Sequence, residues 1–204
     1  MVIIVGVLAL QGGFSLHQQI LKKIGVESVF VKNSYDLNKV DGLVIPGGES
    51  TTISLLIKRF DMFNALIDFG KKNPIMGTCA GLIMMSSSVD DKRIKPLGLV
   101  NIAVERNAYG RQIESKTEII QFRFTENHKL NLPTTFIRAP MIKNINDEVQ
   151  VIGEYNDSPI AILSNHHLCL SFHPELNQID IFHRILFDKR SDYYYKNINQ
   201  YHAS

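Results

Sequence analysis

The sequence predicts an α/β protein whose central sheet is mostly parallel and is extended by antiparallel strands. Two features predict this fold class. In roughly the first 85 residues, short apolar runs alternate with segments of helical periodicity, which is the order of an open sheet with right-handed crossovers. In the rest of the chain, strand-like segments follow one another with only turn residues between them. At 204 residues, 45% of them hydrophobic, the chain has the length and apolar content for one such domain.

The N-terminal half begins with an apolar run at residues 2–10, which is typical of a parallel strand buried on both faces. A helix is expected from Phe14, because apolar residues then recur at helical spacing until Gly25. The later elements expected in this half are strands at 26–31, 41–45 and 74–78, one helix that Ser50 or Thr51 caps and that extends to Phe69, and a helix that begins at Ala80.

The C-terminal half is expected to contain short strands and one closing helix. The strand candidates are residues 97–105, 117–124, 134–138, 149–155, 160–163 and 168–172, and the helix spans about residues 178–188. No linker or internal repeat divides the chain, so residues 1–190 are interpreted as a single domain. Residues 191–204 contain four of the seven tyrosines and are interpreted as a tail that is frayed or docked on the surface.

Composition and charge exclude several classes of protein. A formal charge of +2 is too small for a nucleic-acid groove or a polybasic membrane patch. Two cysteines 90 positions apart form neither a disulfide framework nor a zinc knuckle. The N-terminal apolar run is too short to span a bilayer and lacks the basic segment and cleavage site of a signal peptide. We therefore expect a cytoplasmic protein with reduced thiols and with neither a nucleic acid nor a membrane as partner.

The strongest local signal of chemistry surrounds Cys79. Gly77-Thr78-Cys79-Ala80-Gly81 lies between a predicted strand and a predicted helix, and its G-x-C-x-G spacing is that of a nucleophile elbow. The small glycines relieve crowding around a strained turn, and the positive end of the helix dipole favours a thiolate. The backbone N–H of Ala80 can then stabilise an oxyanion. The alternative is a buried cysteine in a glycine-rich turn, with no catalytic role.

A thiolate nucleophile needs a base and a group that orients the base. His173 is distinctive among the seven histidines, because it follows the apolar run 168–172 and precedes Pro174, which disfavours a helical conformation at His173. Glu175 is close enough in sequence to accept a ring N–H and fix the tautomer. For a single histidine without this context, a structural role would be the better interpretation.

Glycine-rich loops are expected at the same edge of the sheet, where open α/β sheets place their sites. Pro46-Gly47-Gly48-Glu49-Ser50 follows a predicted strand and can supply a second oxyanion donor, whereas no phosphate-binding glycine motif occurs in the chain. Gln11-Gly12-Gly13 is a second loop of this kind or only a tight turn.

These motifs resemble those of a known family. G-T-C-A-G-L at 77–82 and S-F-H-P-E-L at 171–176 resemble the class I, or triad, glutamine amidotransferases, whose fold is a flavodoxin-like three-layer α/β sandwich. L-Q-G at 10–12, P-G-G-E-S-T-T at 46–52, E-R-N-A-Y-G-R-Q at 105–112 and F-I-R-A-P at 136–140 are similar to the glutaminase subunits of pyridoxal 5′-phosphate synthase. The stretch from Val89 to Lys95 and the tail match nothing in that family.

The resemblance implies a catalytic triad and a set of glutamine-binding residues. The triad is Cys79, His173 and Glu175, and the oxyanion hole is formed by the backbone N–H groups of Gly48 and Ala80. The implied substrate-binding residues are Gly48, Glu49, Ser50, Arg106, Ile137 and Arg138. A guanidinium suits the α-carboxylate of free glutamine, although the two arginines taken alone would be interpreted as structural ion pairs.

The resemblance also implies the reaction and the partner. L-Glutamine is hydrolysed to L-glutamate and ammonia through a thioester, and the ammonia passes to a (β/α)8-barrel pyridoxal 5′-phosphate synthase subunit. The glutaminase is expected to be weak alone and to be activated by docking, through rearrangement of the Gly47-Gly48 peptide. Neither a metal nor pyridoxal phosphate is expected to bind this chain as a cofactor. Two alternatives remain: a glutaminase for imidazole glycerol phosphate or anthranilate synthesis, and a non-catalytic protein that binds glutamine and regulates a partner.

Overall fold

The computed structural model of the chain describes residues 3–106, 115–146 and 149–202. Its centre is a nine-stranded sheet in the order β2-β1-β3-β4-β12-β11-β10-β7-β8. The strands are β1 (Ile4–Leu8), β2 (Glu27–Val31), β3 (Gly42–Ile45), β4 (Ile75–Thr78), β7 (Lys116–Arg123), β8 (Lys129–Phe136), β10 (Val149–Tyr155), β11 (Ser158–Ser164) and β12 (His167–Leu170).

Two kinds of strand pairing divide the sheet. The strands β2, β1, β3, β4 and β12 run parallel to one another, in the strand order 2-1-3-4-5 of flavodoxin-like folds. Beyond β12, the strands β11, β10, β7 and β8 pair in antiparallel fashion. The predicted fold class, a mostly parallel sheet with an antiparallel extension, is therefore confirmed.

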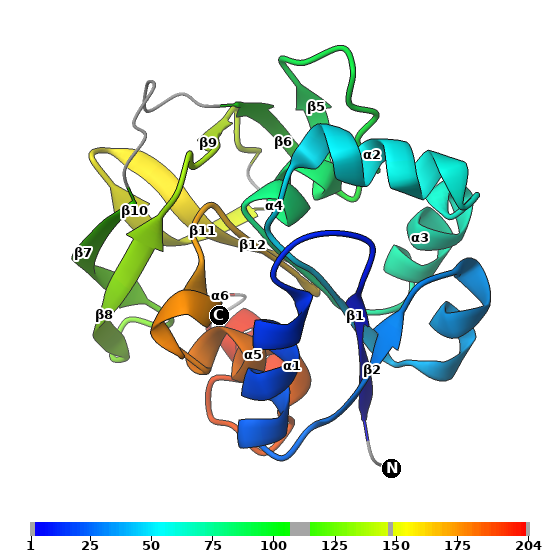
Figure 1. Cartoon of the computed structure of the whole chain (residues 1–204). Helices are drawn as coiled ribbons and strands as arrows, with labels where there is room; N and C mark the ends of the chain where they lie inside the picture. The colour runs from blue at the N-terminus through cyan, green and yellow to red at the C-terminus, as the bar shows by residue number, and fades with distance from the viewer. Residues whose placement is uncertain (1–2, 107–114, 147–148, 203–204) are drawn as a thin grey trace.

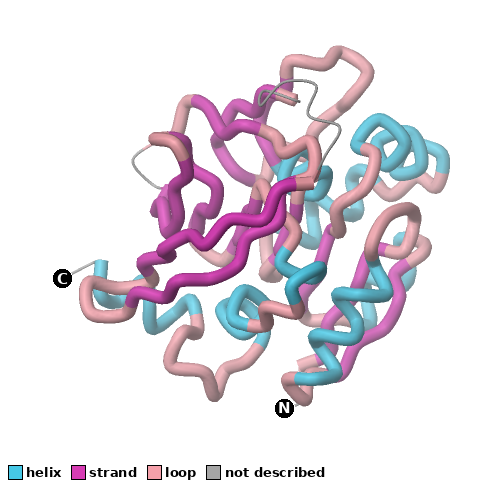
Figure 2. The backbone as a smooth tube through the Cα atoms, turned by 60° about the vertical axis from the view of Figure 1, so that its left-hand side comes forward, coloured by secondary structure: helices cyan, strands magenta, loops and turns pink. Residues whose placement is uncertain are grey.

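Helices cover both faces of the sheet, which gives three layers (Figure 1). One face carries α1 (Phe14–Lys23), α5 (Ile181–Phe187) and α6 (Tyr195–His202). The opposite face carries η1 (Ser34–Lys39), α2 (Ser50–Arg59), α3 (Phe63–Gly70) and α4 (Ala80–Met85). The strands of the antiparallel extension come forward in Figure 2, at the side of the molecule away from the first helices.

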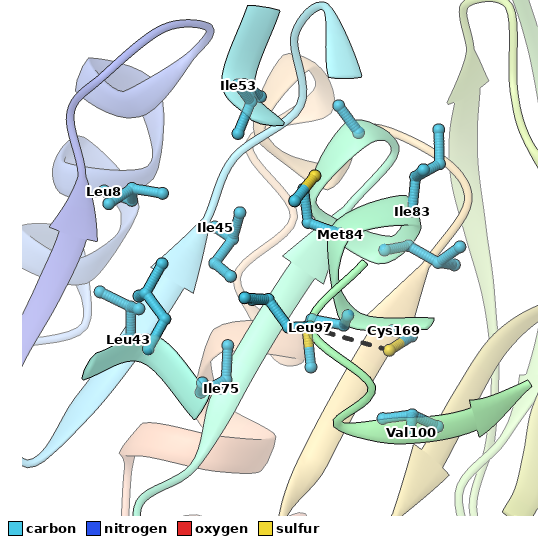
Figure 3. Close-up of a cluster of buried hydrophobic side chains, with 14 of the residues drawn as sticks. Leu8, Leu43, Ile45, Ile53, Ile75, Ile83, Met84, Leu97, Val100 and Cys169 are labelled. Carbon is cyan, nitrogen blue, oxygen red and sulfur yellow. Dashed lines mark hydrogen bonds between the residues drawn. The ribbon is translucent and has the colours of Figure 1, made fainter. Parts of the chain in front are cut away.

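The parallel strands β1, β3, β4 and β12 are buried on both faces, whereas β2 at the edge of the sheet is only partly buried. The side chains of the buried strands alternate between two cores. Leu43 and Ile45 of β3 and Ile75 of β4 belong to the cluster beneath α2, α3 and α4 (Figure 3). Val44 and Met76, from the same strands, belong to the cluster beneath α1 and α5. Strands buried in this way have continuous apolar sequences, which is why the sequence located them so well.

One predicted helix is in fact two, α2 and α3. Its first part ends at a left-handed residue, Asp61, with φ of 50°. The N–H groups of Asp61 and Met62 donate to the carbonyl groups of Lys58 and Ile57, which is the Schellman arrangement that glycine usually completes. Because an aspartate fills this place, the break could not be recognised from the residue pattern.

The predicted cap of this helix was also wrong. Neither Ser50 nor Thr51 is the N-cap. The side chain of Glu49 caps α2 by accepting from the backbone N–H of Thr52, with 2.7 Å between the oxygen and the nitrogen.

The second half of the chain departs from the prediction in its pairing. The strands β5 (Ser86–Val89), β6 (Val100–Glu105) and β9 (Met141–Lys143) form a separate three-stranded sheet, and neither β5 nor β9 was predicted. Strand β12 belongs to the parallel half, because it pairs with β4. Strand β8 begins before the predicted residue 134 and contains Pro133, which an edge strand tolerates because it has a side without a partner strand.

The C-terminal tail contains a helix, α6, that packs on the sheet. Ile198 is only 1% exposed and lies in the core cluster beneath α1 and α5, and the ring of Tyr193 contacts that of Phe124 edge-on. The docked form of the tail therefore agrees with the structure, while the division into residues 1–190 and 191–204 stays a prediction. Within the described ranges, no helix is long and apolar enough to cross a membrane.

The burial of Ile198 predicts that the tail contributes to stability. We expect Ile198→Ala to lower the free energy of unfolding by about 2 kcal/mol or more, as truncation of a buried isoleucine does. The matched control is Ile119→Ala, because Ile119 on β7 is 69% exposed and its truncation should change stability by less than about 0.5 kcal/mol. Urea denaturation measures both, and equal effects of the two substitutions would show that the tail does not dock.

Candidate active site

The predicted site residues converge at the carboxyl edge of the parallel strands. A cavity of about 270 Å³ opens there. It lies near the ends of β1 and β3, the neighbouring strands between which the direction of the chain's connections across the sheet reverses. Its lining residues are Gln11, Gly48, Glu49, Ser50, Cys79, Ile83, Arg106, Ile137, Arg138 and His173. Every predicted substrate-binding residue is among them. Of the other predicted residues, Ala80 directly follows Cys79, and Glu175 is buried behind His173.

Cys79 adopts a rare backbone conformation at the junction of β4 and α4, with φ of 48° and ψ of −101°. Tight packing holds this conformation in place. A Cβ on Gly81 would lie 1.9 Å from the carbonyl oxygen of Ile45, and a Cβ on Gly77 would lie 2.6 Å from the carbonyl carbon of Gly81. The elbow geometry expected from the G-x-C-x-G spacing is therefore present, and both glycines are needed for it.

His173 lies between Cys79 and Glu175. Its Nδ1 is 2.7 Å from Oε1 of Glu175, and the thiol of Cys79 is its other side-chain hydrogen-bond partner. Burial by itself lowers the pKa of His173, but the hydrogen bonds with Cys79 and Glu175, together with the charge of Glu175, outweigh it and raise the pKa to about 10. The imidazole is thus a cation at neutral pH, and this cation is placed to stabilise a thiolate at Cys79.

The two glycine loops of the sequence pack against each other beside Cys79. The carbonyl of Gly47 accepts from the N–H of Gly13 at 3.2 Å, and a Cβ on Gly12, whose φ is 102°, would lie 1.9 Å from the same carbonyl oxygen. The side chain of Gln11 accepts from the N–H of Glu49 at 2.8 Å. The loop at residues 11–13 is therefore more than a tight turn, because it fixes the position of the Gly47-Gly48 loop.

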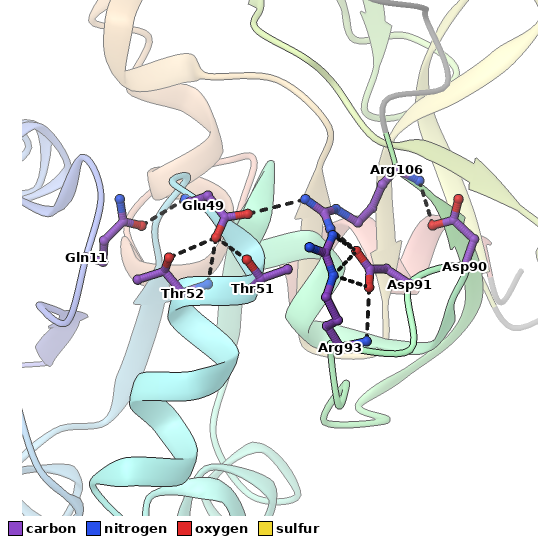
Figure 4. Close-up of polar contacts among 8 residues, drawn as sticks. All are labelled: Gln11, Glu49, Thr51, Thr52, Asp90, Asp91, Arg93 and Arg106. Carbon is purple, nitrogen blue, oxygen red and sulfur yellow. Dashed lines mark hydrogen bonds and ion pairs between the residues drawn. The ribbon is translucent and has the colours of Figure 1, made fainter.

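A cluster of charges forms one wall of the cavity (Figure 4). Arg106 forms ion pairs with Glu49, at 3.3 Å between Nη2 and Oε1, and with Asp91. Asp91 is in turn held by Arg93, and hydrogen bonds from Arg93 lower the pKa of its carboxyl group. Arg106 thus forms structural ion pairs and also lines the cavity, while its role in binding substrate stays a prediction.

Glu49 remains ionised in this cluster. Burial raises the pKa of Glu49, but hydrogen bonds from Thr51 and Thr52 outweigh it and lower the pKa to about 2. The cavity therefore presents a fixed carboxylate beside the guanidinium of Arg106.

The segment at Ile137 and Arg138 forms the wall facing Cys79. The carbonyl oxygen of Ile137 lies 3.9 Å from Sγ of Cys79. Arg138 is left-handed, with φ of 45°, and such strain in a residue other than glycine occurs preferentially at functional sites.

Several residues of the site were not predicted. Asp91 lies in a stretch that matched no motif, and Gln11 was noted only as part of a glycine loop and of the L-Q-G motif, with no role of its own. His17 and Thr78 lie behind the cavity, where His17 contacts Glu175 and Thr78 contacts Gly47. Only their contacts in the folded chain reveal them, because each is remote in sequence from its partner. Residues 107–112 of the predicted arginine segment lie outside the described residues.

Nothing in the described ranges resembles a metal centre, since no group of three or more histidine, cysteine, aspartate or glutamate side chains is arranged to hold an ion. The chemistry that the described residues offer is that of a nucleophilic thiol beside a protonated imidazole and a buried carboxylate.

A flavodoxin-like sheet with a cysteine elbow and a histidine–glutamate pair at its carboxyl edge defines the class I glutamine amidotransferases, the class that the sequence predicts. A family model described as the SNO glutamine amidotransferase family matches residues 7–190, and the chain belongs to this family. It is therefore an enzyme, a glutamine amidotransferase, as the sequence predicts.

Individual relatives agree with this assignment. The chain is 42% identical over 188 residues to "Pyridoxal 5'-phosphate synthase subunit PdxT" of Solibacter usitatus, a match that covers 91% of this chain and 98% of the relative. It is 40% identical over 190 residues to the protein of the same name from Brevibacillus brevis, covering 93% and 98% of the two chains. Among solved structures, a crystal structure of a glutamine amidotransferase is similar with a TM-score of 0.82 and 35% identity, over 89% of this chain and 96% of that one.

The raised pKa of His173 predicts a measurable dependence on Cys79. In Cys79→Ala the thiol partner is lost, so we expect the pKa of His173 to fall from about 10 toward its ordinary value of 6.5. Proton NMR of the imidazole Cε1–H during a pH titration measures this. Cys169→Ala is the control, because Cys169 is buried elsewhere in the core. An identical titration of His173 in the wild type and in Cys79→Ala would contradict the pairing.

Proposed function

We propose that this chain is the glutaminase subunit of a pyridoxal 5′-phosphate synthase and that it hydrolyses L-glutamine through Cys79. The observation that carries the proposal is the arrangement at one cavity of Cys79, of His173 as its hydrogen-bond partner, and of Glu175 at 2.7 Å from His173. The names of the relatives support the choice of synthase, because both of those described above are pyridoxal 5′-phosphate synthase subunits.

In this proposal the reaction proceeds in two steps. The thiolate of Cys79 attacks the side-chain amide carbon of glutamine, and the backbone N–H groups of Ala80 and Gly48 stabilise the oxyanion, each by about 3 kcal/mol. The imidazolium of His173 donates its proton to the departing ammonia. His173 then activates a water molecule, which cleaves the thioester and releases glutamate.

The charges of the cavity suit free glutamine. Arg106 and Arg138 line the cavity and carry the positive charge that attracts an α-carboxylate. Glu49, with its pKa lowered to about 2, provides a negative charge that suits an α-ammonium. Gly48, Ser50 and Ile137 complete the binding surface. A zwitterionic amino acid fits this wall better than a simple anion does.

The ammonia passes to the partner, a (β/α)8-barrel synthase subunit. Docking of this partner activates the glutaminase by rearranging the Gly47-Gly48 peptide. The contacts of the loop at residues 11–13 support such a switch, because the hydrogen bond from Gly13 to Gly47 holds that peptide in its present orientation. The mechanism also requires Cys79 to stay reduced, which the cytoplasm ensures.

The two alternatives are less well supported. A glutaminase for imidazole glycerol phosphate or anthranilate synthesis does not account for the names of the relatives. A non-catalytic glutamine-binding protein needs neither the strained backbone of Cys79 nor the protonated imidazole beside it.

The proposal predicts ammonia release that depends on Cys79 and on the partner. We expect L-glutamine hydrolysis to rise when a (β/α)8-barrel pyridoxal 5′-phosphate synthase subunit is added, and not when imidazole glycerol phosphate or anthranilate synthase subunits are added. Cys79→Ala should lower the rate by about 1,000-fold or more, because no nucleophile remains, whereas Cys169→Ala should retain it. A Cys79→Ala variant as active as the wild type would refute the nucleophile, and absence of ammonia with every partner would refute the function.

A further inference from the structure

Two fully buried histidines lie directly behind the catalytic carboxylate. His17 is on α1 and His183 is on α5, and neither has any exposed surface. Neither residue lines the cavity. Completely buried histidines normally have a partner for each ring nitrogen, so their contacts indicate what they do.

The contacts of these histidines form a chain that ends at the triad. Nδ1 of His17 is 2.9 Å from Nε2 of His183. Nε2 of His17 is 3.4 Å from Oε2 of Glu175 and 3.3 Å from Oγ1 of Thr78. The other oxygen of Glu175, Oε1, faces Nδ1 of His173. Glu175 is thus held between two imidazoles, one on each carboxylate oxygen.

One arrangement of protons leaves no N–H of these two histidines without a partner. Among the described residues, Oε2 of Glu175 has no hydrogen bond of ordinary geometry, and Nδ1 of His183 has none either. If His17 carries its proton on Nε2, that proton lies between Oγ1 of Thr78, at 3.3 Å from Nε2, and Oε2 of Glu175, at 3.4 Å, while Nδ1 accepts from Nε2–H of His183. The partnerless Nδ1 of His183 is then a lone pair. The opposite tautomers would aim a lone pair at the carboxylate and bury an orphaned N–H, which is the costlier arrangement.

We propose that His17 is a positioning residue of the glutaminase, which holds Glu175 ionised and aimed at His173 by presenting Nε2–H to Oε2, in a tautomer that His183 fixes. The inference rests on the proposed function, because Glu175 matters only if His173 acts on Cys79. It extends the triad to two residues that do not touch the substrate.

Charge considerations support a neutral donor at this place. Burial and the charge of His173 keep the pKa of His17 low, at about 4, although the charge of Glu175 raises it. Complete burial likewise keeps the pKa of His183 well below its ordinary value. The groups that face Glu175 are therefore a neutral His17 and a protonated His173. A neutral donor stabilises the carboxylate without competing with His173 for its charge.

Thr78 extends the same contacts to the glycine loop. Its hydroxyl oxygen accepts from the N–H of Gly47 at 2.9 Å and lies 3.3 Å from Nε2 of His17. His17 therefore contacts both Glu175 and Thr78, and Thr78 in turn holds the loop that carries Gly48. Its loss should affect turnover more than substrate affinity.

Three substitutions separate positioning from packing. His17→Leu removes both ring nitrogens at similar volume. His17→Gln places an amide N–H near the position of Nε2, within reach of Glu175, whereas the shorter His17→Asn places one near Nδ1, toward His183. The glutamine and asparagine variants are therefore a matched pair. They differ in whether the amide N–H is directed at Glu175 or at His183.

The experiment measures kcat and KM of ammonia release in the complex with the barrel synthase subunit, and the pH profile of Cys79 alkylation by a glutamine-like diazo-ketone. We expect kcat to fall about tenfold or more in His17→Leu and His17→Asn, with KM within twofold of the wild type, and to recover in His17→Gln. Without the Nε2–H donor the pKa of buried Glu175 rises, so the carboxylate is neutralised sooner on acidification. The acid limb of the alkylation profile should therefore move up by about one pH unit.

Two outcomes would overturn the proposal. The first is that His17→Leu and His17→Asn have the same kcat as the wild type and the same acid limb in the pH profile of Cys79 alkylation. The other is an equal loss in all three variants together with a lowered melting temperature, which would indicate a packing role alone. Imidazole 15N NMR of the wild type gives a further check, because a proton on Nδ1 of His17 would contradict the assigned tautomer. If the wild type itself neither releases ammonia nor reacts at Cys79, the proposed function fails, and this inference fails with it.

Discussion

The whole site depends on the close packing of helix α4 against strand β3. A Cβ on Gly81 would lie 1.9 Å from the carbonyl oxygen of Ile45, so only glycine lets the helix approach this closely. That approach forces the turn at Cys79 into its strained conformation and brings it beside the loop that follows β3. The position of the sulfur is therefore set by backbone packing in the core, and the strain is supported by the many buried contacts of the sheet.

The charges around this turn are arranged by depth. Deep in the molecule, the buried carboxylate of Glu175 lies between the neutral His17, which contacts His183, and the protonated His173, so that its charge acts mainly on His173. At the rim, where solvent screens charges, Arg106 forms ion pairs with Glu49 and Asp91. This wall of the cavity therefore carries both positive and negative charge. The deep charges suit proton transfer at the sulfur, and the rim charges suit recognition of a zwitterion.

The sequence predicted the parts of the structure that depend on neighbouring residues. Buried parallel strands have continuous apolar runs. The backbone conformations at Cys79 and His173 depend on a few adjacent residues, so short motifs predict them. It did not predict the break at Asp61, because an aspartate occupies the left-handed position usually held by glycine. Nor did it predict the roles of His17 or Asp91, because their partners are remote in the chain and only the fold brings them together.

The most direct test of this account is to look for the covalent intermediate. The complex with the barrel synthase subunit would be mixed with L-glutamine, quenched with acid within the first turnover, digested and analysed by mass spectrometry. We expect a glutamyl thioester on the peptide that contains Cys79 and an unmodified Cys169. Turnover of glutamine with Cys79 free of adduct at every quench time would contradict it.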